Sequence, residues 1–316
     1  DRSGNPIVFE GAALETVLEV FSNGRRILTS KNLMLDNNFK GFNMRIAKWA
    51  KTLGMKTHYY ISPQIWAWKE SRITEIKRDI DKMYVILPFE KKFYEDKHHF
   101  PVEFVGHPLI DAIYNQPIVD PVLFRKENQL NDKPIIAILP GSRKQEITKM
   151  LAVMLSVVND FPDHQFVIAG APSQEFSFYQ KFITQENIKF ISNKTYDLLR
   201  NATAALVTSG TATLETALFK VPEVVCYKGS WASYQIAKRI ITLKYISLVN
   251  LIMDEEVVTE LIQEECNTKR IREELQKTLK TNDRNTLLEK YALLEEKLGG
   301  IGASEKTATL IVNDLK

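Results

Sequence analysis

The sequence predicts an α/β protein built from two domains, each with a mostly parallel sheet. Its 316 residues exceed what one compact core usually serves. Short apolar runs alternate with helical patterns along most of the chain, and this alternation is typical of βαβ units. The alternation stops around Asn-Gln-Pro at 115–117 and then starts again. We therefore expect a junction between two α/β halves near 107–117.

The expected elements follow from the period of the apolar residues. In the first half we expect helices over 42–54, 71–81 and 89–96, and strands over 57–61, 83–87 and 102–105. In the second half we expect strands over 135–139, 165–169, 188–191, 204–207 and 223–227, and helices over 146–160, 176–185, 196–201 and 212–219. A last helix over 305–316 can join either half.

Composition excludes several classes of protein. Hydrophobic residues at 44% and charged residues at 26% are ordinary for a soluble globular chain. A net charge of +3 argues against a nucleic-acid partner recruited by overall charge. Cys226 and Cys266 fit no metal spacing and are too few for a disulfide framework, so we expect a reduced, cytosolic compartment. Since no apolar run is long enough to span a bilayer, any membrane contact is expected at the surface.

A sharp turn after the apolar run 135–139 is the first candidate site. In Leu-Pro-Gly-Ser-Arg-Lys-Gln-Glu-Ile, Ser142 stands three residues before Gln145, which is the spacing of a capping box and makes Ser142 the expected N-cap. Gly141 lets the backbone approach a ligand, and Arg143 offers a forked cationic donor. A helix N-terminus favours anions, so the turn predicts a phosphate or diphosphate site. A capped helix with solvated charges explains the same pattern, and both interpretations stay open here.

A second turn of the same kind follows the run 204–207. It places Ser209, Gly210, Thr211 and Thr213 before a helix that carries Glu215. Such a turn can hold a phosphate, and a nearby carboxylate can accept hydrogen bonds from ribose hydroxyls. An ordinary β–α loop with hydroxyl caps is the alternative. Because neither turn is followed by a Walker lysine, the pair predicts a nucleotide held without P-loop chemistry.

Six strings in order resemble one family. They are YYISPQIWAW, VILPFEKKFYE, FVGHPLID, LPGSRKQEI, SGTATLE and GASEKTA. From about Gly41 to the C-terminus the chain resembles lipid-A-disaccharide synthase, the glycosyltransferase of lipid A assembly. The resemblance implies a GT-B fold, with two Rossmann-like domains facing a cleft. It assigns 1–110 to the acceptor and membrane-facing domain, joined by the last helix, and 111–304 to the UDP-sugar domain.

The resemblance also implies the reaction and its partners. UDP-2,3-diacylglucosamine would donate its sugar to the 6-hydroxyl of 2,3-diacylglucosamine 1-phosphate with inversion, giving a β(1→6) disaccharide and UDP. Arg143 would stabilise the leaving diphosphate. We expect no cofactor and no metal, because the only Asp-x-Asp motif, Asp79 to Asp81, lies at the end of a charged helical pattern.

A later stretch, Ser-Leu-Val-Asn-Leu-Ile-Met to Glu-Glu at 247–265, resembles the family's donor-side segment. By that match Asn250, Glu260 and Gln263 would contact the nucleotide sugar. Val249 stands where the family has proline. Glu260 also belongs to a run of acidic residues, and a solvated surface carboxylate is the alternative for it.

The first domain departs from the family pattern. Relatives begin with a strand and a Gly-Glu-x-Ser-Gly-Asp loop, whereas this chain has Arg2-Ser3-Gly4 without a preceding strand. Asp36 is the nearest match to the family's base, offset by two residues, and Asn38 holds the matching position. An inverting transfer needs a base within reach of the attacking hydroxyl, so Asp36 is the predicted base. We expect this domain to be truncated or rebuilt.

An apolar stripe near the N-terminus predicts a helix with two candidate roles. The predicted membrane or acyl contacts are Leu14, Val17, Leu18, Phe21, Arg25 and Arg26. Their spacing fits an interfacial helix beside anionic headgroups, and a core helix predicts the same stripe. With acylated substrates, the expected location is cytoplasmic, peripheral on the lipid surface of the inner face of the bacterial inner membrane.

Three aromatic or histidine side chains admit two interpretations. Trp66 and Trp68, with Lys69 and Arg72, can line the acceptor side or fill a strand-to-helix corner, and we expect the corner for Trp66. His107, before a proline at the junction, is a structural residue or a residue of the cleft.

Two other functions fit the same fold. A UDP-N-acetylglucosamine epimerase or another GT-B enzyme would use a water-soluble donor and need no apolar N-terminal segment. A UDP-sugar or lipid-binding protein without catalysis would bind UDP without turnover, and the altered first domain favours it. The complete donor-side turns favour the transferase.

Overall fold

A computed structural model describes residues 17–22, 25–30, 40–208, 210–229 and 244–315. The chain forms two compact units. The first contains residues 1–114 and 297–316, and the second contains residues 115–296. The junctions therefore fall at Tyr114/Asn115 and Glu296/Lys297, about four residues after the expected 110/111 and about eight before the expected 304/305. No described helix is long and apolar enough to cross a membrane.

The second unit has a six-stranded parallel sheet within the described residues, in the order β11-β10-β9-β6-β7-β8. Its strands are β6 (Ile135–Leu139), β7 (Gln165–Gly170), β8 (Ile188–Ser192), β9 (Ala202–Thr208), β10 (Glu223–Tyr227) and β11 (Thr259–Ile262). Its helices are α5 (Pro121–Glu127), α6 (Lys144–Leu155), η3 (Val158–Asp160), α7 (Phe176–Gln180), α8 (Thr195–Asn201), α9 (Thr211–Leu218), α11 (Leu248–Met253), η4 (Gln263–Glu265), α12 (Thr268–Thr278) and α13 (Thr281–Lys297).

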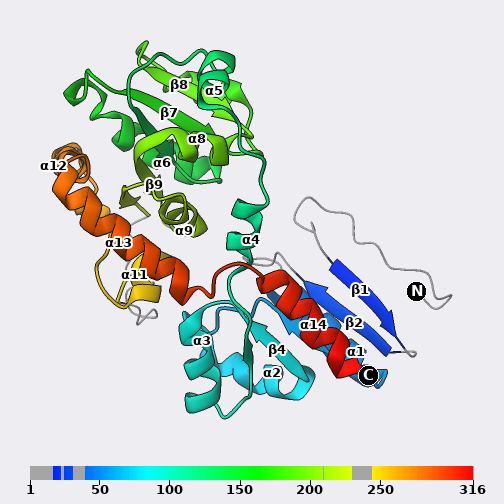
Figure 1. The fold of residues 1–316 in the computed structure, drawn as a ribbon. Helices are drawn as coiled ribbons and strands as arrows, with labels where there is room; N and C mark the ends of the chain where they lie inside the picture. The colour runs from blue at the N-terminus through cyan, green and yellow to red at the C-terminus, as the bar shows by residue number, and fades with distance from the viewer. Residues whose placement is uncertain (1–16, 23–24, 31–39, 209, 230–243, 316) are drawn as a thin grey trace. The chain divides into compact units, whose positions relative to one another are not determined.

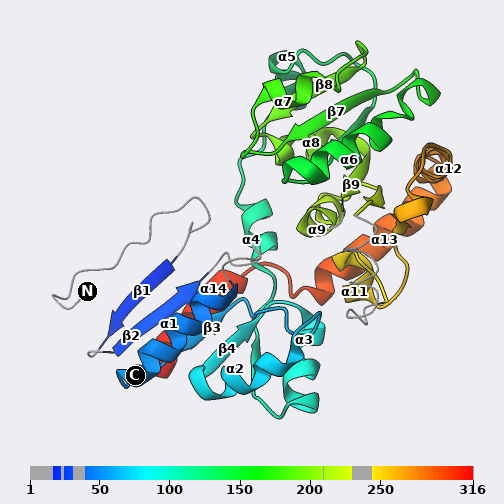
Figure 2. The ribbon, with the colours of Figure 1, turned by 180° about the vertical axis from the view of Figure 1, so that it is seen from behind.

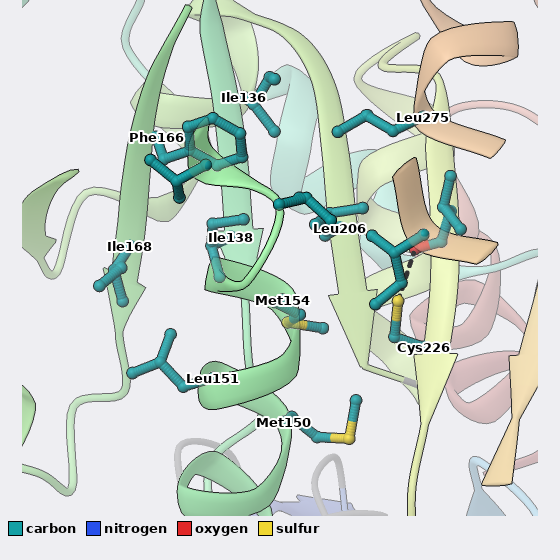
Figure 3. Close-up of a cluster of buried hydrophobic side chains, with 14 of the residues drawn as sticks. Ile136, Ile138, Met150, Leu151, Met154, Phe166, Ile168, Leu206, Cys226 and Leu275 are labelled. Atoms are coloured by element: carbon teal, nitrogen blue, oxygen red, sulfur yellow. Dashed lines mark hydrogen bonds between the residues drawn. The ribbon is translucent and has the colours of Figure 1, made fainter. Parts of the chain in front are cut away.

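Both faces of this sheet are covered by helices, which explains why its strands are continuous apolar runs. Every residue of β6 is buried. On one face, side chains of α6, α7 and α12 pack against β6, β7, β9 and β10, and Figure 3 shows Met150, Leu151 and Met154 of α6 against this face. On the other face, α5 and α8 contribute Phe124, Leu198 and Leu199.

The first unit is smaller and has two separate sheets. A parallel sheet has the order β3-β4-β5, formed by β3 (His58–Tyr60), β4 (Lys82–Val85) and β5 (Glu103–Phe104). The hairpin pairs β1 (Val17–Ser22) with β2 (Arg25–Ser30). The helices are α1 (Lys40–Thr52), η1 (Glu70–Arg72), α2 (Ile73–Asp79), α3 (Pro88–Lys92), the π-helical turn η2 (Phe93–Lys97), α4 (Pro108–Tyr114) and α14 (Ala303–Leu315).

The predicted N-terminal helix is wrong, because the described part of that segment is a hairpin. Val17 pairs with Ser30 and Phe21 with Arg26 in an antiparallel ladder, drawn in blue in Figure 1. Asn-Gly at 23–24 is the dipeptide typical of a two-residue hairpin, and this was the signal to weigh against the apolar spacing. Of the predicted contacts, Leu14 lies outside the described residues, and Val17, Leu18, Phe21, Arg25 and Arg26 lie on strands.

The last helix belongs to the first unit, and a buried carboxylate explains how it is held. Asp111 of α4 accepts hydrogen bonds from the Gly302 N–H at 2.6 Å and the Ser304 N–H at 2.8 Å, which lie at the start of α14. Partial burial acts to raise the pKa of the Asp111 carboxyl. The hydrogen bonds outweigh this effect, so the pKa lies below its usual value. At the other end of α14, Lys56 pairs with Asp314, and His58 Nε2 lies 3.3 Å from the same carboxylate. Helix α14 contacts α4 within the first unit and is drawn in red in Figure 2. The strings FVGHPLID and GASEKTA thus meet in one contact.

Candidate functional site

The strand order of the second unit creates one topological switch point. Numbered along the unit, the order β8-β7-β6-β9-β10-β11 is 3-2-1-4-5-6, and the switch lies between β6 and β9. These two strands are parallel, and Leu139 pairs with Val207 at their carboxyl ends. Ligands of open α/β sheets bind outside the carboxyl ends of the strands at such a point. The two predicted turns, after 139 and after 208, therefore leave the sheet side by side.

The first turn has the tight backbone that its glycine predicted. Gly141 adopts a φ of 100°, a conformation that side chains rarely tolerate. The Arg143 side chain is exposed and makes no hydrogen bond or ion pair with any described residue, while the Arg143 carbonyl accepts from the Ile147 N–H at 2.9 Å. The predicted capping box is wrong: Arg143, not Ser142, is the N-cap of α6, and no side chain caps the helix. The Ser142 N–H instead donates to the Glu146 carboxylate at 3.3 Å.

Glu146, which the sequence analysis did not select, lies over this turn. A Cβ at position 141 would lie 2.3 Å from Glu146 Oε2, so the carboxylate packs directly on the glycine. The position of Glu146 in the first turn of α6 was visible in the sequence, because carboxylates favour helix N-termini. The protein's own anion thus lies where the sequence predicts a ligand anion. The loop between β7 and α7 also contacts this turn, because Ser173 Oγ donates to the Ser142 carbonyl at 3.3 Å.

The second turn, at the start of α9, contains residues that differ in burial. Gly210 is the N-cap of α9 with a φ of 133°, and among the described residues other than its two chain neighbours no heavy atom lies within 4 Å of a Cβ built there. Thr211 is half-buried. Thr213 is fully buried and its hydroxyl donates to the Gly210 carbonyl at 2.8 Å, so it shapes the turn, and its contact with the donor stays a prediction. Ser209 lies outside the described residues.

Glu215 lies one turn into α9, in a low-dielectric environment. Burial raises the pKa of its carboxyl to about 7, and a hydrogen bond from Tyr196 opposes this rise. The Tyr196 hydroxyl donates to Glu215 Oε1 at 3.4 Å, and its ring contacts Phe219 at a centroid distance of 5.0 Å. Tyr196 was missed as a partner because it belongs to another helix, α8, and only the fold brings its hydroxyl to Glu215.

Asn250 is the centre of a saturated hydrogen-bond network. Its Nδ2 donates to the Val258 carbonyl and to Glu260, both at 2.9 Å. Its Oδ1 accepts from the N–H groups of Val257 at 2.8 Å and Val258 at 3.0 Å. An amide offers two donors and two acceptor sites, and all four are used within the chain. Asn250 therefore shapes the segment after α11, and its contact with the nucleotide sugar stays a prediction.

Glu260 belongs to the same network and is not a solvated member of an acidic run. Its carboxylate accepts from the Ile246 and Ser247 N–H groups at 2.9 Å each, in addition to Asn250. These bonds anchor the segment that enters α11. A direct contact of Glu260 with a nucleotide sugar stays a prediction.

The carboxyl ends of β10 and β11 contribute a further polar edge. Gln263 follows β11 with a φ of 53°, and its Nε2 is buried without a partner among the described residues. A Cβ at Gly229 would lie 3.4 Å from that nitrogen. Lys228, which the sequence analysis missed, donates to the Cys266 carbonyl at 3.4 Å. Its place directly after a buried strand could have identified it, since β10 ends at the same edge.

In the first unit, Asp36 lies outside the described residues. His107 is buried, burial lowers its pKa to about 4, and Nδ1 lies 3.2 Å from the Leu109 N–H, which donates to it. Trp66 fills a corner as expected, with its ring 4.8 Å from Phe89 at 85°. Within the described part of the chain, no group of three histidine, cysteine, aspartate or glutamate side chains could hold a metal ion.

The fold and the switch point define the class of protein. The structure resembles that of MnaA from S. aureus with UDP (TM-score 0.59, 13% identity, 85% of this chain and 70% of that chain). It also resembles UDP-GlcNAc 2-epimerase from Neisseria meningitidis bound to UDP-GlcNAc (TM-score 0.55, 13% identity, 84% and 72%). At this identity the likeness shows the fold alone, and the class is GT-B.

The sequence comparisons then narrow the class to one family. The family model described as Lipid-A-disaccharide synthetase matches residues 15–310. A lipid-A-disaccharide synthase from Coxiella burnetii is 37% identical over 295 residues, covering 90% of this chain and 76% of the relative. One from Geobacter sulfurreducens is 34% identical over 328 residues, covering 96% and 81%. The chain belongs to the lipid-A-disaccharide synthase family, whose members are glycosyltransferases.

Proposed function

We propose that this chain condenses UDP-2,3-diacylglucosamine with 2,3-diacylglucosamine 1-phosphate. The 6-hydroxyl oxygen of the acceptor attacks the anomeric carbon of the donor, the bond from that carbon to the diphosphate breaks, and UDP leaves. The hydroxyl proton passes to a base, and the anomeric centre inverts to give a β(1→6) disaccharide 1-phosphate. The observation that carries the proposal is the switch point of the second unit in a member of this family, where two glycine turns meet.

The second unit would hold the donor. Gly141 and Gly210 let the backbone approach the diphosphate, and the N-termini of α6 and α9 direct N–H groups toward it. Arg143 would neutralise the charge that develops on the leaving diphosphate. Glu215 would accept hydrogen bonds from the ribose hydroxyls, and Gln263 and Glu260 would contact the nucleotide sugar. This division of roles uses backbone N–H groups together with side chains and needs no metal.

The first unit would bind the acceptor, with Asp36 as the base. A carboxylate base removes the proton from a hydroxyl as the oxygen bonds to carbon, so its distance from that hydroxyl decides its effect. For Asp36→Asn we expect a strong loss of turnover with UDP binding retained. Unchanged turnover would assign the base to another residue.

Both substrates carry acyl chains, so the enzyme would work at a lipid surface. We propose that it is a peripheral protein of the inner face of the inner membrane, and that the N-terminal hairpin contributes to the contact. The hairpin carries Arg25 and Arg26, whose charge suits anionic headgroups. Loss of vesicle binding on Arg25→Gln/Arg26→Gln, with transfer retained in detergent micelles, is the expected result. Unchanged binding would assign the contact to another surface.

The test is one assay on this chain with both substrates in detergent micelles and EDTA. UDP release and disaccharide are followed together by mass spectrometry. We expect both products in EDTA, and near-complete loss with a retained fold for Arg143→Ala. Arg272→Ala, at a partly exposed arginine of α12, is the matched control and should keep activity. UDP binding without product would refute the transferase and favour a binding protein, and an active Arg143→Ala would remove the leaving-group role.

A further inference from the structure

The segment 61–69 follows β3 at the carboxyl end of the parallel sheet of the first unit, and both of its ends are strained. Ile61 has a φ of 64° and Lys69 a φ of 57°. Isoleucine is β-branched, and a positive φ is a genuine outlier for such a residue. The Ile61 N–H nevertheless donates to the Tyr84 carbonyl of β4 at 3.1 Å. Backbone strain of this kind persists only where the surroundings impose it, and it clusters at ligand sites.

A buried carboxylate imposes the shape of this segment. Glu90 of α3 is 1% exposed and accepts four hydrogen bonds. Two come from the segment itself, from Ser62 Oγ at 2.5 Å and Trp66 Nε1 at 3.0 Å. Two come from the Ile86 and Leu87 N–H groups after β4, at 3.1 and 2.9 Å. The strings ISPQIWAW and LPFE are therefore joined by one side chain, which the mechanism above does not use.

The other end of the segment presents groups suited to a ligand. Trp68 is partly exposed and Lys69 is exposed. The Lys69 ammonium lies 4.6 Å from the centroid of the Trp68 ring. An indole offers a flat apolar face with a polarised edge, and the ammonium beside it is a compact charge that pairs with phosphate. Trp66, in contrast, is committed to Glu90 and Phe89.

We propose that the segment 61–69 binds the phosphorylated sugar of the acceptor. Trp68 packs against the sugar ring, and Lys69 pairs with the phosphate. Glu90 is a positioning residue that holds the segment in its strained shape. This inference rests on the proposed function, and it adds the acceptor contacts that the donor-side residues leave unassigned. The carboxyl end of a parallel sheet is where such a ligand is expected.

The test compares two acceptors, 2,3-diacylglucosamine 1-phosphate and the same sugar without phosphate, at saturating donor. In the wild-type chain, removal of the phosphate should raise the acceptor KM about fivefold, as expected for one exposed charge pair. Lys69→Gln should abolish most of this discrimination and leave UDP affinity unchanged. Lys92→Gln removes an equal charge from an exposed position of α3 and should keep the discrimination. Discrimination retained in Lys69→Gln would overturn the proposal.

Glu90 is tested by the same ratio, which a loss of stability alone would not change. Glu90→Gln places an amide N–H among four donors, so the segment should lose its shape and the discrimination should fall. If this variant does not fold, Trp66→Phe removes one donor and leaves the carboxylate in place, and a smaller fall is expected. An unchanged ratio in Trp66→Phe and in a folded Glu90→Gln would overturn the positioning role. A wild-type chain that makes no product with either acceptor would instead refute the transferase.

Discussion

The Glu215 carboxyl makes the stability of the second unit depend on pH in a defined direction. Burial raises its pKa from 4.5 to about 7 in the folded chain. As pH rises from 4.5 to 7, the carboxyl ionises in the unfolded chain while it stays protonated in the folded chain. The unfolded state therefore releases its proton first, and the folded state loses stability over this interval.

The magnitude follows from the difference between 7 and 4.5. Each pKa unit corresponds to about 1.4 kcal/mol, so the loss approaches about 3 kcal/mol by pH 7 and then stays constant. Glu215→Gln replaces the carboxyl by an amide that cannot ionise and can still accept the Tyr196 hydrogen bond. At pH 4.5 we expect the variant and the wild-type chain to have similar stability. At pH 8 we expect the variant to be more stable by about 3 kcal/mol.

The measurement is the free energy of unfolding in urea at pH 4.5, 6 and 8, for both chains. All other titrating groups are shared, so the difference between the chains isolates Glu215. Glu186→Gln, at an exposed carboxylate of the same unit, is the control, and its difference from the wild-type chain should not change with pH. A Glu215→Gln difference that is the same at all three pH values would refute the burial argument.

Three further variants test particular contacts. Glu146→Gln removes the anion beside the Ser142 N–H. A charge pair 4 Å apart in water is worth about 1 kcal/mol, so UDP should bind about fivefold more tightly to the variant, as measured by calorimetry. Unchanged or weaker binding would contradict this. Asn250→Ala leaves two buried N–H groups unpaired and should lower the urea unfolding free energy by about 3 kcal/mol; a loss below about 1 kcal/mol would contradict the network. Asp111→Ala should cost about 2 kcal/mol and speed amide hydrogen exchange in α14, while α6 stays protected; an unchanged α14 would contradict the cap.

Sequence patterns predicted the second unit well because its strands are buried on both faces. The bounds of β6 and β10 match the expected 135–139 and 223–227 residue for residue, since a buried parallel strand is an uninterrupted apolar run with a glycine or a polar turn at its end. The same logic placed the two turns at Gly141 and Gly210, whose glycines adopt positive φ. It failed at 14–21, where the apolar spacing fits a helix and a hairpin alike, and pairing with residues 25–30 decided the outcome.

The amino-acid sequence by itself determined the fold class, the family, and the positions of the turns that would hold a nucleotide. These are properties of local patterns and of strings matched in order. The tertiary structure alone decided which polar side chains are used in hydrogen bonds within the chain. Asp111 accepts a hydrogen bond at the start of a helix 191 residues away. Glu90 accepts hydrogen bonds from the segment that follows β3. The amide of Asn250 forms all four of its hydrogen bonds within the chain. The reason is physical: an unpaired buried polar atom costs free energy, so burial favours pairing, and packing, not sequence distance, sets which partner is in reach.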